Sequence, residues 1–352
     1  MRQKICVLSE GLGGTQDEGM RNFVFALSEA LGREHDVRAI GLDTGARTPG
    51  GVKTNRLLLS RKLRRTIAQH SPDVVLYVPL ASSTVGSYLR SWVLGRLYSR
   101  APVVMLALQP RRHGSLDYKI MQRFHPDALL AQDSSSISDG PDNIPKGTLP
   151  SGVDTDRFKP VRPQERLWLR RSIGLEEPDF AVLHVGHIRR QRNVAFMSAL
   201  CEEPSCRPIL IGSTSTEQDD DLAAELEQAG AMVIRKRIPD IEHYYQAADC
   251  YLFPVNSDQA AMEMPLSVLE AMATNLPVLS TRFGALPIHF PEGGGIWYFD
   301  EVTEIPALLE NVRRKIIVST REQIMPFSWD QIAARLTETL EKWGMLPGGG
   351  AS

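Results

Sequence analysis

The chain has 352 residues, which is too long for one ordinary hydrophobic core and indicates two domains of roughly 150 to 200 residues each. Hydrophobic residues make up 42% of the chain and charged residues 23%, so the composition is that of a globular protein. The formal net charge is −2, but residues 1–150 carry a net +7 and residues 151–352 a net −9. These values exclude a minimal binding module and a largely disordered chain.

The four cysteines, Cys6, Cys201, Cys206 and Cys250, have neither the CxxC spacing of a metal site nor the density of a disulfide framework. We therefore expect reduced thiols in a cytoplasmic protein. The apolar run at residues 5–8 is too short for the core of a signal peptide, and no run approaches the roughly 18 residues of a membrane span. The sequence predicts a protein that does not cross a bilayer.

The first half alternates short apolar runs with amphipathic segments, which is the pattern of βα units on a parallel sheet. A predicted strand at residues 5–8 precedes a glycine loop at residues 11–15 and a helix with Phe23, Leu27 and Leu31 on one face. Further strands are predicted at residues 37–42, 73–78, 103–108 and 127–131, the last of which closes the set. Such a sheet binds ligands at the carboxyl ends of its strands.

A second α/β series begins after residues 151–160, with strands predicted at residues 181–185, 208–212, 231–234, 250–253 and 277–280. The predicted fold class is α/β, with two facing Rossmann-like doubly wound domains and a cleft between them. We expect domains at residues 1–155 and 156–326. The last segment, residues 327–352, is predicted to form a helix and a flexible tail, and the helix is expected to pack back on the first domain through Ile332, Leu336 and Leu340.

The glycine loop lies between a predicted strand and a predicted helix, and Asp43 ends the second strand, which would suit a dinucleotide site. The fingerprint is incomplete, because Gln16 occupies the place of a third glycine. An NAD(P)-dependent oxidoreductase is therefore the third-ranked hypothesis. Close approach of the backbone to a ligand nevertheless explains four glycines better than a tight turn does: Gly11, Gly13, Gly14 and Gly19.

Two segments that follow predicted strands of the second half could bind a diphosphate. The loop GHIRRQR at residues 186–192 supplies four cations or hydrogen-bond donors, although a solvated basic loop is the alternative. The second segment, residues 260–273, starts a helix near Pro265, and the free N–H groups of that helix would favour a phosphate. Glu270 in this helix could accept hydrogen bonds from ribose hydroxyls, or be an ordinary solvated glutamate.

Three consecutive acids, Asp219, Asp220 and Asp221, have the spacing of a metal-binding Asp-x-Asp. They come directly before an apolar helical segment, where carboxylates stabilise a helix N-terminus. The sequence therefore predicts a helix start there and no metal site.

Four motifs in order resemble the retaining GT-B glycosyltransferases of the glycogen-synthase-like, glycosyl transferases group 1 superfamily. They are SGVDTDRFKP at residues 151–160, VGHIRRQR at 185–192, residues 244–249 before a strand, and SVLEAMA at 267–273. The resemblance covers nearly the whole chain, since residues 18–31 and 327–330 also fit it. It implies an acceptor bound mainly by residues 1–155 and a nucleotide-diphosphate sugar bound mainly by residues 156–326.

Carried over by position, Arg192 falls where the superfamily has a diphosphate-binding lysine, and His187 where it has the partner arginine. Glu270 falls on the second acid of the Glu-x7-Glu motif, which binds the ribose. The predicted donor-binding set is Gly186, Arg189, Arg237, Ile238, Leu266, Ser267 and Glu270. The predicted catalytic set is Arg192, His187, Glu263 and His113.

On the acceptor side, the implied residues are Gly13, Gly14 and Gln109. Gln109 occupies what we take to be the usual place of a superfamily histidine. His113, in the same predicted loop, is then the candidate for contact with the sugar or the acceptor, or it is a surface histidine.

The sequence departs from the superfamily at the first acid of the Glu-x7-Glu motif, which would be residue 262 and is Met262. Glu263 lies one place off and could substitute only if the loop shifts its register. The paired glycines after the next strand are reduced to Phe283 and Gly284. The second-ranked hypothesis is therefore a nucleotide-binding GT-B protein with lost or altered transfer activity.

The resemblance implies transfer of a hexosyl group to a carbohydrate, lipid-linked or small-molecule acceptor, in polysaccharide or glycoconjugate biosynthesis. The departing diphosphate gains negative charge, which Arg192, Arg189, His187 and N–H groups near Leu266 and Ser267 could stabilise without a metal or cofactor. For retention, the resemblance suggests front-face attack in which the leaving phosphate takes the acceptor proton. No carboxylate nucleophile is then required.

Residues 51–125 contain 13 lysines and arginines against two acids, a net charge of +11. Residues 56–65 combine leucines with a basic cluster, and residues 88–100 mix aromatic residues with arginine. These segments could contact anionic lipid at the inner membrane surface, or form a solvated helix face. We expect a cytoplasmic protein, with peripheral membrane contact as a hypothesis. No nucleic-acid partner is expected, because the sequence contains no reading motif.

Overall fold

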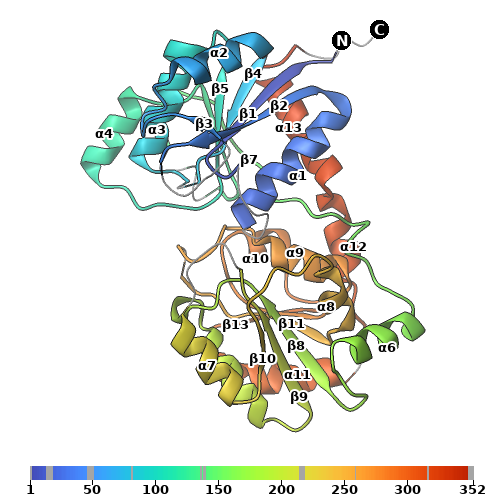
Figure 1. Cartoon of the computed structure of the whole chain (residues 1–352). Coiled ribbons are helices and arrows are strands. Elements are labelled where there is room, and N and C mark those ends of the chain that lie inside the picture. The colour runs from blue at the N-terminus through green and yellow to red at the C-terminus, as the bar shows by residue number, and fades with distance from the viewer. Residues whose placement is uncertain are drawn as a thin grey trace. The chain divides into compact units, whose positions relative to one another are not determined.

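The computed structural model describes residues 2–12, 19–45, 51–80, 82–134, 137, 140–213, 219–257, 259–314 and 317–347. The chain divides into two compact units, one of Met1–Gly152 with Trp329–Ser352 and the other of Val153–Ser328. Each unit contains one sheet of parallel strands flanked by helices, which is the predicted α/β, Rossmann-like class (Figure 1).

The first unit has a seven-stranded sheet in the order β3-β2-β1-β4-β5-β6-β7. Its strands are β1 (Lys4–Ser9), β2 (Asp36–Asp43), β3 (Val52–Lys53), β4 (Val74–Tyr77), β5 (Val103–Ala107), β6 (Ala128–Ala131) and β7 (Lys146–Thr148). Its helices are α1 (Gly19–Glu34), α2 (Arg61–His70), α3 (Val85–Val93), the π-helical turn η1 (Leu94–Tyr98), α4 (Ser115–Arg123) and α13 (Trp329–Lys342). The strand order reverses between the neighbours β1 and β4, so the carboxyl ends of these two strands flank the crevice where such sheets bind ligands.

The second unit has a six-stranded sheet in the order β10-β9-β8-β11-β12-β13. Its strands are β8 (Phe180–Val185), β9 (Cys206–Ile211), β10 (Met232–Ile234), β11 (Cys250–Phe253), β12 (Val278–Thr281) and β13 (Ile296–Phe299). Its longer helices are α6 (Pro163–Ser172), η3 (Val194–Glu202), α7 (Asp220–Gln228), α9 (Leu266–Ala273) and α11 (Ile305–Arg313). Shorter helical turns are η2 (Arg190–Arg192), α8 (Glu242–Ala247), α10 (Leu286–His289), η4 (Val302–Glu304), α12 (Thr320–Ile324) and η5 (Met325–Phe327). The order reverses between β8 and β11, which are neighbours.

The long apolar runs of the sequence became the central strands, because a parallel strand covered by helices on both faces has no solvent side. All of β4, β5, β6, β11 and β12 are buried. Three edge or near-edge strands were not predicted, and the expectation that residues 127–131 close the first set was wrong. Of these, β3 has two residues and β7 reads Lys-Gly-Thr, so neither carries an apolar run that marks a strand. The third is β13, which pairs with β12.

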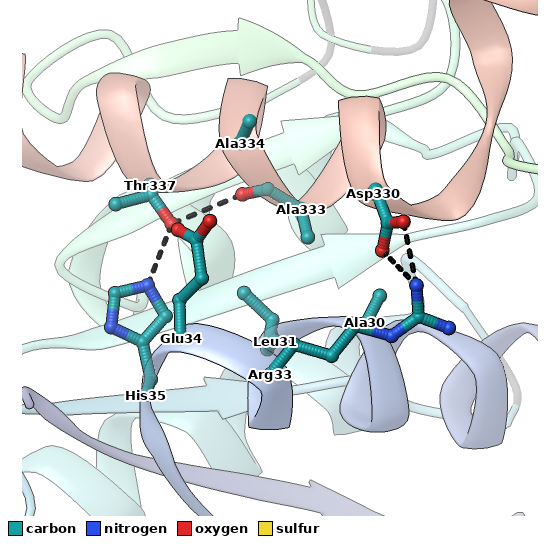
Figure 2. Close-up of a pocket in the computed structure, with 9 residues that line it drawn as sticks. All are labelled: Ala30, Leu31, Arg33, Glu34, His35, Asp330, Ala333, Ala334 and Thr337. Atoms are coloured by element: carbon teal, nitrogen blue, oxygen red, sulfur yellow. Dashed lines mark hydrogen bonds and ion pairs between the residues drawn. The ribbon is translucent and has the colours of Figure 1, made fainter.

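Helix α13 packs along α1 in the first unit (Figure 1). The ring of Trp329 meets the ring of Phe23 edge to face at 5.3 Å, while Ile332, Leu336 and Leu340 are buried. Residues from both helices line a pocket at this junction (Figure 2). Arg33 Nη1 lies 2.6 and 2.7 Å from the carboxylate oxygens of Asp330, and a 3.0 Å hydrogen bond joins the His35 ring to Thr337. Apolar packing with a polar rim therefore fastens this helix to the first unit.

All four cysteines are free thiols. Cys6, Cys206 and Cys250 are buried, and burial raises the pKa of the Cys206 thiol to about 11. These thiols are therefore un-ionised and unreactive at neutral pH. Within the described stretches of the chain, no helix is both long and apolar enough to cross a membrane.

Candidate functional site

The candidate site of the second unit lies at the point where its strand order reverses. One loop follows β8 and contains Gly186, and the other follows β11 and leads into α9. Because β8 and β11 are adjacent parallel strands, both loops leave the same edge of the sheet. Asn193 donates a 3.1 Å hydrogen bond from its side chain to the Pro254 carbonyl, which ties the two loops together.

Gly186 and Arg192 are in close contact within this pair of loops. A Cβ on Gly186 would lie only 2.6 Å from Arg192 Nη1, so glycine is required for the guanidinium to reach its position. Arg192 Nη2 donates a hydrogen bond of 2.5 Å to the Ala260 carbonyl in the loop after β11. This acceptor is neutral, so the contact does not cancel the positive charge of the guanidinium.

His184 also lies at this site, although no motif in the sequence marks it. Its Nδ1 donates a 2.9 Å hydrogen bond to the Leu252 carbonyl, which leaves Nε2 as an acceptor, and Nε2 has no hydrogen-bond partner among the described residues. A Cβ on Gly186 would lie 3.2 Å from this atom, as well as 2.6 Å from Arg192 Nη1. Burial is the main cause that lowers the pKa of His184 to about 4; the nearby charge of Arg192 acts in the same direction, and the hydrogen bond to Leu252 opposes them. The ring is therefore neutral at pH 7.

Glu270 contacts the hydroxyl of Tyr245, which donates a 2.7 Å hydrogen bond to Oε2. Burial raises the pKa of Glu270 to about 6, although this hydrogen bond and the nearby Arg157 guanidinium favour the charged form. The glutamate is half-buried and contacts neighbouring side chains, so the alternative of an ordinary solvated residue does not fit. Tyr245 and Arg157 lie in segments that resemble the superfamily, but the sequence linked neither of them to Glu270, and the contact of Tyr245 depends on the packing of α8 against α9.

Several of the predicted site residues lie around the hydroxyl of Tyr251. This hydroxyl donates to the Val185 carbonyl at 3.3 Å. Burial raises the pKa of the Tyr251 hydroxyl. Ser267 and Arg192 lower this pKa and Glu270 raises it, so all three residues lie close enough to interact with the hydroxyl. Gly186, Arg192, Ser267 and Glu270 therefore gather at one edge of the sheet. Leu266, in the first turn of α9, is buried beside Ser267.

Met262 and Glu263 are both buried, with 5% and 3% of their surface exposed. The Glu263 carbonyl accepts a 2.9 Å hydrogen bond from the Ala285 N–H, so the loop before α9 packs on the turn after β12. Gly284 has φ +52 and a Cβ there would lie 2.3 Å from the Glu263 carbonyl oxygen. The glycine that the sequence retains after β12 thus allows this close approach.

The remaining donor-side predictions lie in different surroundings. His187 is half-buried and Arg189 exposed in the loop after β8, whereas Arg237 and Ile238 follow β10 at the far edge of the sheet. Arg190, in the same basic loop, is 2.5 Å from Glu225 and 3.8 Å from Asp219, so it forms ion pairs with α7 and its N-cap. Asp219 caps α7 by accepting a 3.0 Å hydrogen bond from the Leu222 N–H, as predicted.

The acceptor-side predictions belong to the first unit. Gly13 and Gly14 lie outside the described residues. Gln109 follows β5 and is buried; its N–H donates to the Ser82 hydroxyl at 2.7 Å, and Arg111 donates to its side-chain oxygen at 3.2 Å. His113, in the same loop, is half-buried. These residues follow a strand next to the point where the order of the first sheet reverses.

Glu10, at the carboxyl end of β1, is a further buried charge at the same edge and was not singled out from the sequence. Its carboxylate lies 2.7 Å from Arg90 Nη1 and accepts a 2.8 Å hydrogen bond from the Tyr77 hydroxyl. Its other oxygen accepts from the Leu80 N–H at 3.2 Å. The carboxylate thus joins β1, β4 and α3, which fixes the start of the glycine loop.

Residues 180–314 match the family model described as glycosyl transferases group 1. A sulfoquinovosyl transferase, SQD2, of Arabidopsis thaliana is 26% identical over 191 residues, which are 51% of this chain and 36% of that protein. The lipopolysaccharide core biosynthesis mannosyltransferase LpsB of Rhizobium meliloti is 26% identical over 194 residues, 52% of each protein. The chain thus spans between about a third and about half the length of these curated relatives.

Solved structures match nearly the whole chain. A sucrose-phosphate synthase of Thermosynechococcus elongatus has a TM-score of 0.75 at 16% identity, covering 97% of this chain and 99% of its own. Anabaena HepE in complex with UDP-glucose has a TM-score of 0.69 at 16% identity, covering 97% and 100%. The chain therefore has the fold of the GT-B glycosyltransferases, and its residues 180–314 match the glycosyl transferases group 1 model.

Proposed function

We propose that this protein transfers a glycosyl group from a nucleotide-diphosphate sugar to a hydroxyl of an acceptor, with retention of the anomeric configuration. The observation that carries the proposal is the gathering of Gly186, Arg192, Ser267 and Glu270 at the switch point between β8 and β11. This edge of a doubly wound sheet is where nucleotides bind. The family match over residues 180–314 covers the same loops.

Each of these groups suits one part of a nucleoside diphosphate. The guanidinium of Arg192 and the first N–H groups of α9, near Leu266 and Ser267, suit the diphosphate oxygens. The absence of a side chain at Gly186 lets the Arg192 guanidinium lie directly against the backbone of this loop. The carboxylate of Glu270 would accept hydrogen bonds from the ribose hydroxyls, with Tyr245 fixing its orientation.

The reaction we propose breaks the bond between the anomeric carbon and the diphosphate oxygen. The acceptor oxygen forms its bond on the same face of the sugar, and its proton passes to the departing phosphate. Negative charge increases on the diphosphate as the bond breaks, so cations already in position stabilise the transition state more than the ground state. We assign this charge stabilisation to Arg192, Arg189 and His187 rather than to a metal ion or cofactor.

The acceptor is proposed to bind at the carboxyl edge of the first sheet, where Gln109 and His113 follow β5. Ser82 holds the backbone of Gln109, and Arg111 donates to its side-chain oxygen, which orients the amide. A buried amide and a half-buried imidazole suit the hydroxyl groups of a carbohydrate, free or lipid-linked.

Met262 favours a second candidate, a GT-B protein that binds nucleotide but has lost or altered transfer. The thioether of a buried methionine is a far weaker hydrogen-bond acceptor for a sugar hydroxyl than a carboxylate, and the neighbouring Glu263 is buried against the turn at Gly284. The donor sugar could then be bound by fewer polar contacts, with loss of transfer or with a different choice of sugar.

Calorimetry with nucleoside diphosphates, followed by mass spectrometry of reactions with a panel of nucleotide sugars, tests both candidates. UDP sugars are the first probes, because HepE, a structural neighbour, was crystallised with UDP-glucose. Transfer or slow hydrolysis of one donor, abolished by Arg192→Ala, is the expected result. Diphosphate binding without release of sugar from any donor would favour the second candidate, and absence of diphosphate binding would reject both.

A further inference from the structure

Three leucines are exposed on two neighbouring segments of the first unit. Leu57 and Leu59 are each 44% exposed, and Leu97 is 47% exposed. The segments lie side by side, since the Ser60 N–H donates a 2.6 Å hydrogen bond to the Tyr98 hydroxyl and Arg90 Nε donates a 2.7 Å hydrogen bond to the Arg56 carbonyl. We call this region, residues 53–65 together with residues 94–100, the leucine corner.

The turn that carries Leu57 and Leu59 is held in one conformation. The side chain of Asn55 accepts hydrogen bonds from the N–H groups of both leucines, at 3.0 and 2.8 Å. Leu58, between them, is fully buried in the core of the unit and has φ +62. A branched residue in this left-handed region is strained. The buried Leu58 anchors the turn, and the two flanking leucines remain exposed.

Exposed cations surround these leucines on every segment of the corner: Lys53, Arg56, Arg61, Lys62, Arg64, Arg65, Arg96 and Arg100. The sequence has no acid in residues 51–72 or 74–100. Arg61 and Lys62 also begin α2, whose first turn carries no acid. Cations are unfavourable at this end of a helix, where the dipole is itself positive. The corner therefore contains eight exposed cations and no carboxylate of its own, although Asp43 pairs with Lys53 across neighbouring strands and Asp127 lies beside Gly95.

We propose that the leucine corner docks on the surface of a bilayer that contains anionic lipids. Three fixed apolar side chains suit the boundary between headgroups and acyl chains, while the surrounding cations suit the headgroup phosphates. A nucleic acid would satisfy the cations but would leave Leu57, Leu59 and Leu97 without an apolar partner. This inference goes beyond the proposed transfer reaction and does not depend on it.

Vesicle flotation of the full chain tests the proposal, with phosphatidylcholine vesicles that contain or lack phosphatidylglycerol. We expect binding to the anionic vesicles only, and its loss when salt rises from about 0.1 M to about 1 M, because the screening length falls from about 10 Å to about 3 Å. Leu57→Ser with Leu59→Ser should weaken binding about tenfold at low salt. Arg61→Gln with Lys62→Gln should weaken it and reduce the dependence on salt.

Matched control variants test whether vesicle binding depends on the leucine corner or on any exposed leucine or cation of the chain. Leu116→Ser removes an exposed leucine, 70% exposed, from α4, and Arg38→Gln with Arg171→Gln removes two exposed cations elsewhere. These variants should bind the anionic vesicles as well as the unaltered chain does. Equal losses in the control and corner variants, binding to neutral vesicles, or a preference for duplex DNA over anionic vesicles would each overturn the proposal.

The substituted leucines are exposed, so the melting temperatures of the leucine variants should stay close to that of the unaltered chain. Calorimetry with nucleoside diphosphates should give the same affinity for the corner variants as for the unaltered chain. Failure of vesicle binding with diphosphate binding intact would reject the docking surface alone. Vesicle binding without diphosphate binding would reject the proposed reaction alone.

Discussion

The hydroxyl of Tyr245 in α8 donates a 2.7 Å hydrogen bond to Oε2 of Glu270 in α9. The bond orients a half-buried carboxylate whose pKa burial raises to about 6, with Arg157 nearby acting in the opposite direction. The carboxylate is costly to ionise, yet the structure surrounds it with groups that favour the charged form. A residue kept at such a cost is a candidate for ligand binding.

Glu270→Gln should make stability less dependent on pH. The folded-state pKa of about 6 lies above the ordinary value of 4.5, so the contribution of Glu270 to stability is fully present below pH 4.5 and is lost as pH rises through 6. The glutamine variant should therefore be more stable than the unaltered chain by up to about 2 kcal/mol at pH 8, with no difference at pH 4.5. Urea unfolding at both pH values is the measurement, and equal stability at pH 8 would contradict the pKa shift.

The same variant should bind nucleoside diphosphates more weakly. A neutral amide accepts weaker hydrogen bonds from ribose hydroxyls than a carboxylate does, so we expect a loss of about tenfold in affinity by calorimetry at pH 8. Tyr245→Phe, which removes only the orienting hydroxyl, should lose less. Unchanged affinity in Glu270→Gln would remove this residue from the site.

Arg192→Ala should weaken diphosphate binding and reduce turnover, each by at least about tenfold, because a charged donor to the diphosphate is lost. Arg190→Ala is the matched control two residues away. Its guanidinium is already paired with Glu225 and half exposed, so its loss should change affinity less than about twofold. Equal effects of the two substitutions would mean that the loop acts only through its net charge.

Gly186→Ala should lower diphosphate affinity with little change in melting temperature. The new Cβ would approach Arg192 Nη1 at 2.6 Å, and the flexible end of that side chain can move aside at small cost to stability. Gly230→Ala is the control, since a Cβ there meets nothing within 4 Å but φ is +103. It should lose about 1 kcal/mol of stability and bind normally. Normal diphosphate affinity in Gly186→Ala, or a loss of affinity in Gly230→Ala, would contradict a role for the contact between Gly186 and Arg192.

His184→Phe should reduce the loss of stability in acid. The folded-state pKa of about 4 lies below the ordinary value of 6.5, so the contribution of His184 is present above pH 6.5 and is lost as pH falls through 4. The unaltered chain should lose up to about 3 kcal/mol from this residue over that range, and the phenylalanine variant should not. Parallel pH profiles of the two proteins would show that the ring is not buried in its neutral form.

Trp329→Ala should detach α13 from the first unit. The indole packs on Phe23, and a Cβ on Gly152 would lie 2.6 Å from its ring, so truncation leaves a gap costing about 2 kcal/mol or more. Asp330→Asn breaks only an ion pair whose side chains are 60% and 56% exposed, and should cost less than about 0.5 kcal/mol. Protease digestion of residues 329–347 and thermal melting would distinguish the two.

The central strands and the two α/β series were predictable, because a buried parallel strand needs a continuous apolar run that is visible in the sequence. The strands β3 and β7 were not, since edge strands of two or three residues carry no such run. In the candidate site, Gly186, Arg192 and Glu270 were found through motifs after strands. His184 and Tyr251 were missed, since a buried aromatic residue with a polar tip has no spacing that distinguishes it from ordinary core. Tyr245 lies in the motif at residues 244–249, but nothing in the sequence linked it to Glu270.

The sequence by itself therefore determined which loops could carry charge and which runs had to be buried, because both depend on residue type and local periodicity. Only the tertiary structure decided which charges act together. Arg190 and Arg192 are two residues apart, yet one pairs with Glu225 on α7 and the other reaches Ala260 after β11. The reason is the parallel pairing of β8 with β11, which brings loops 68 residues apart to one edge of a sheet.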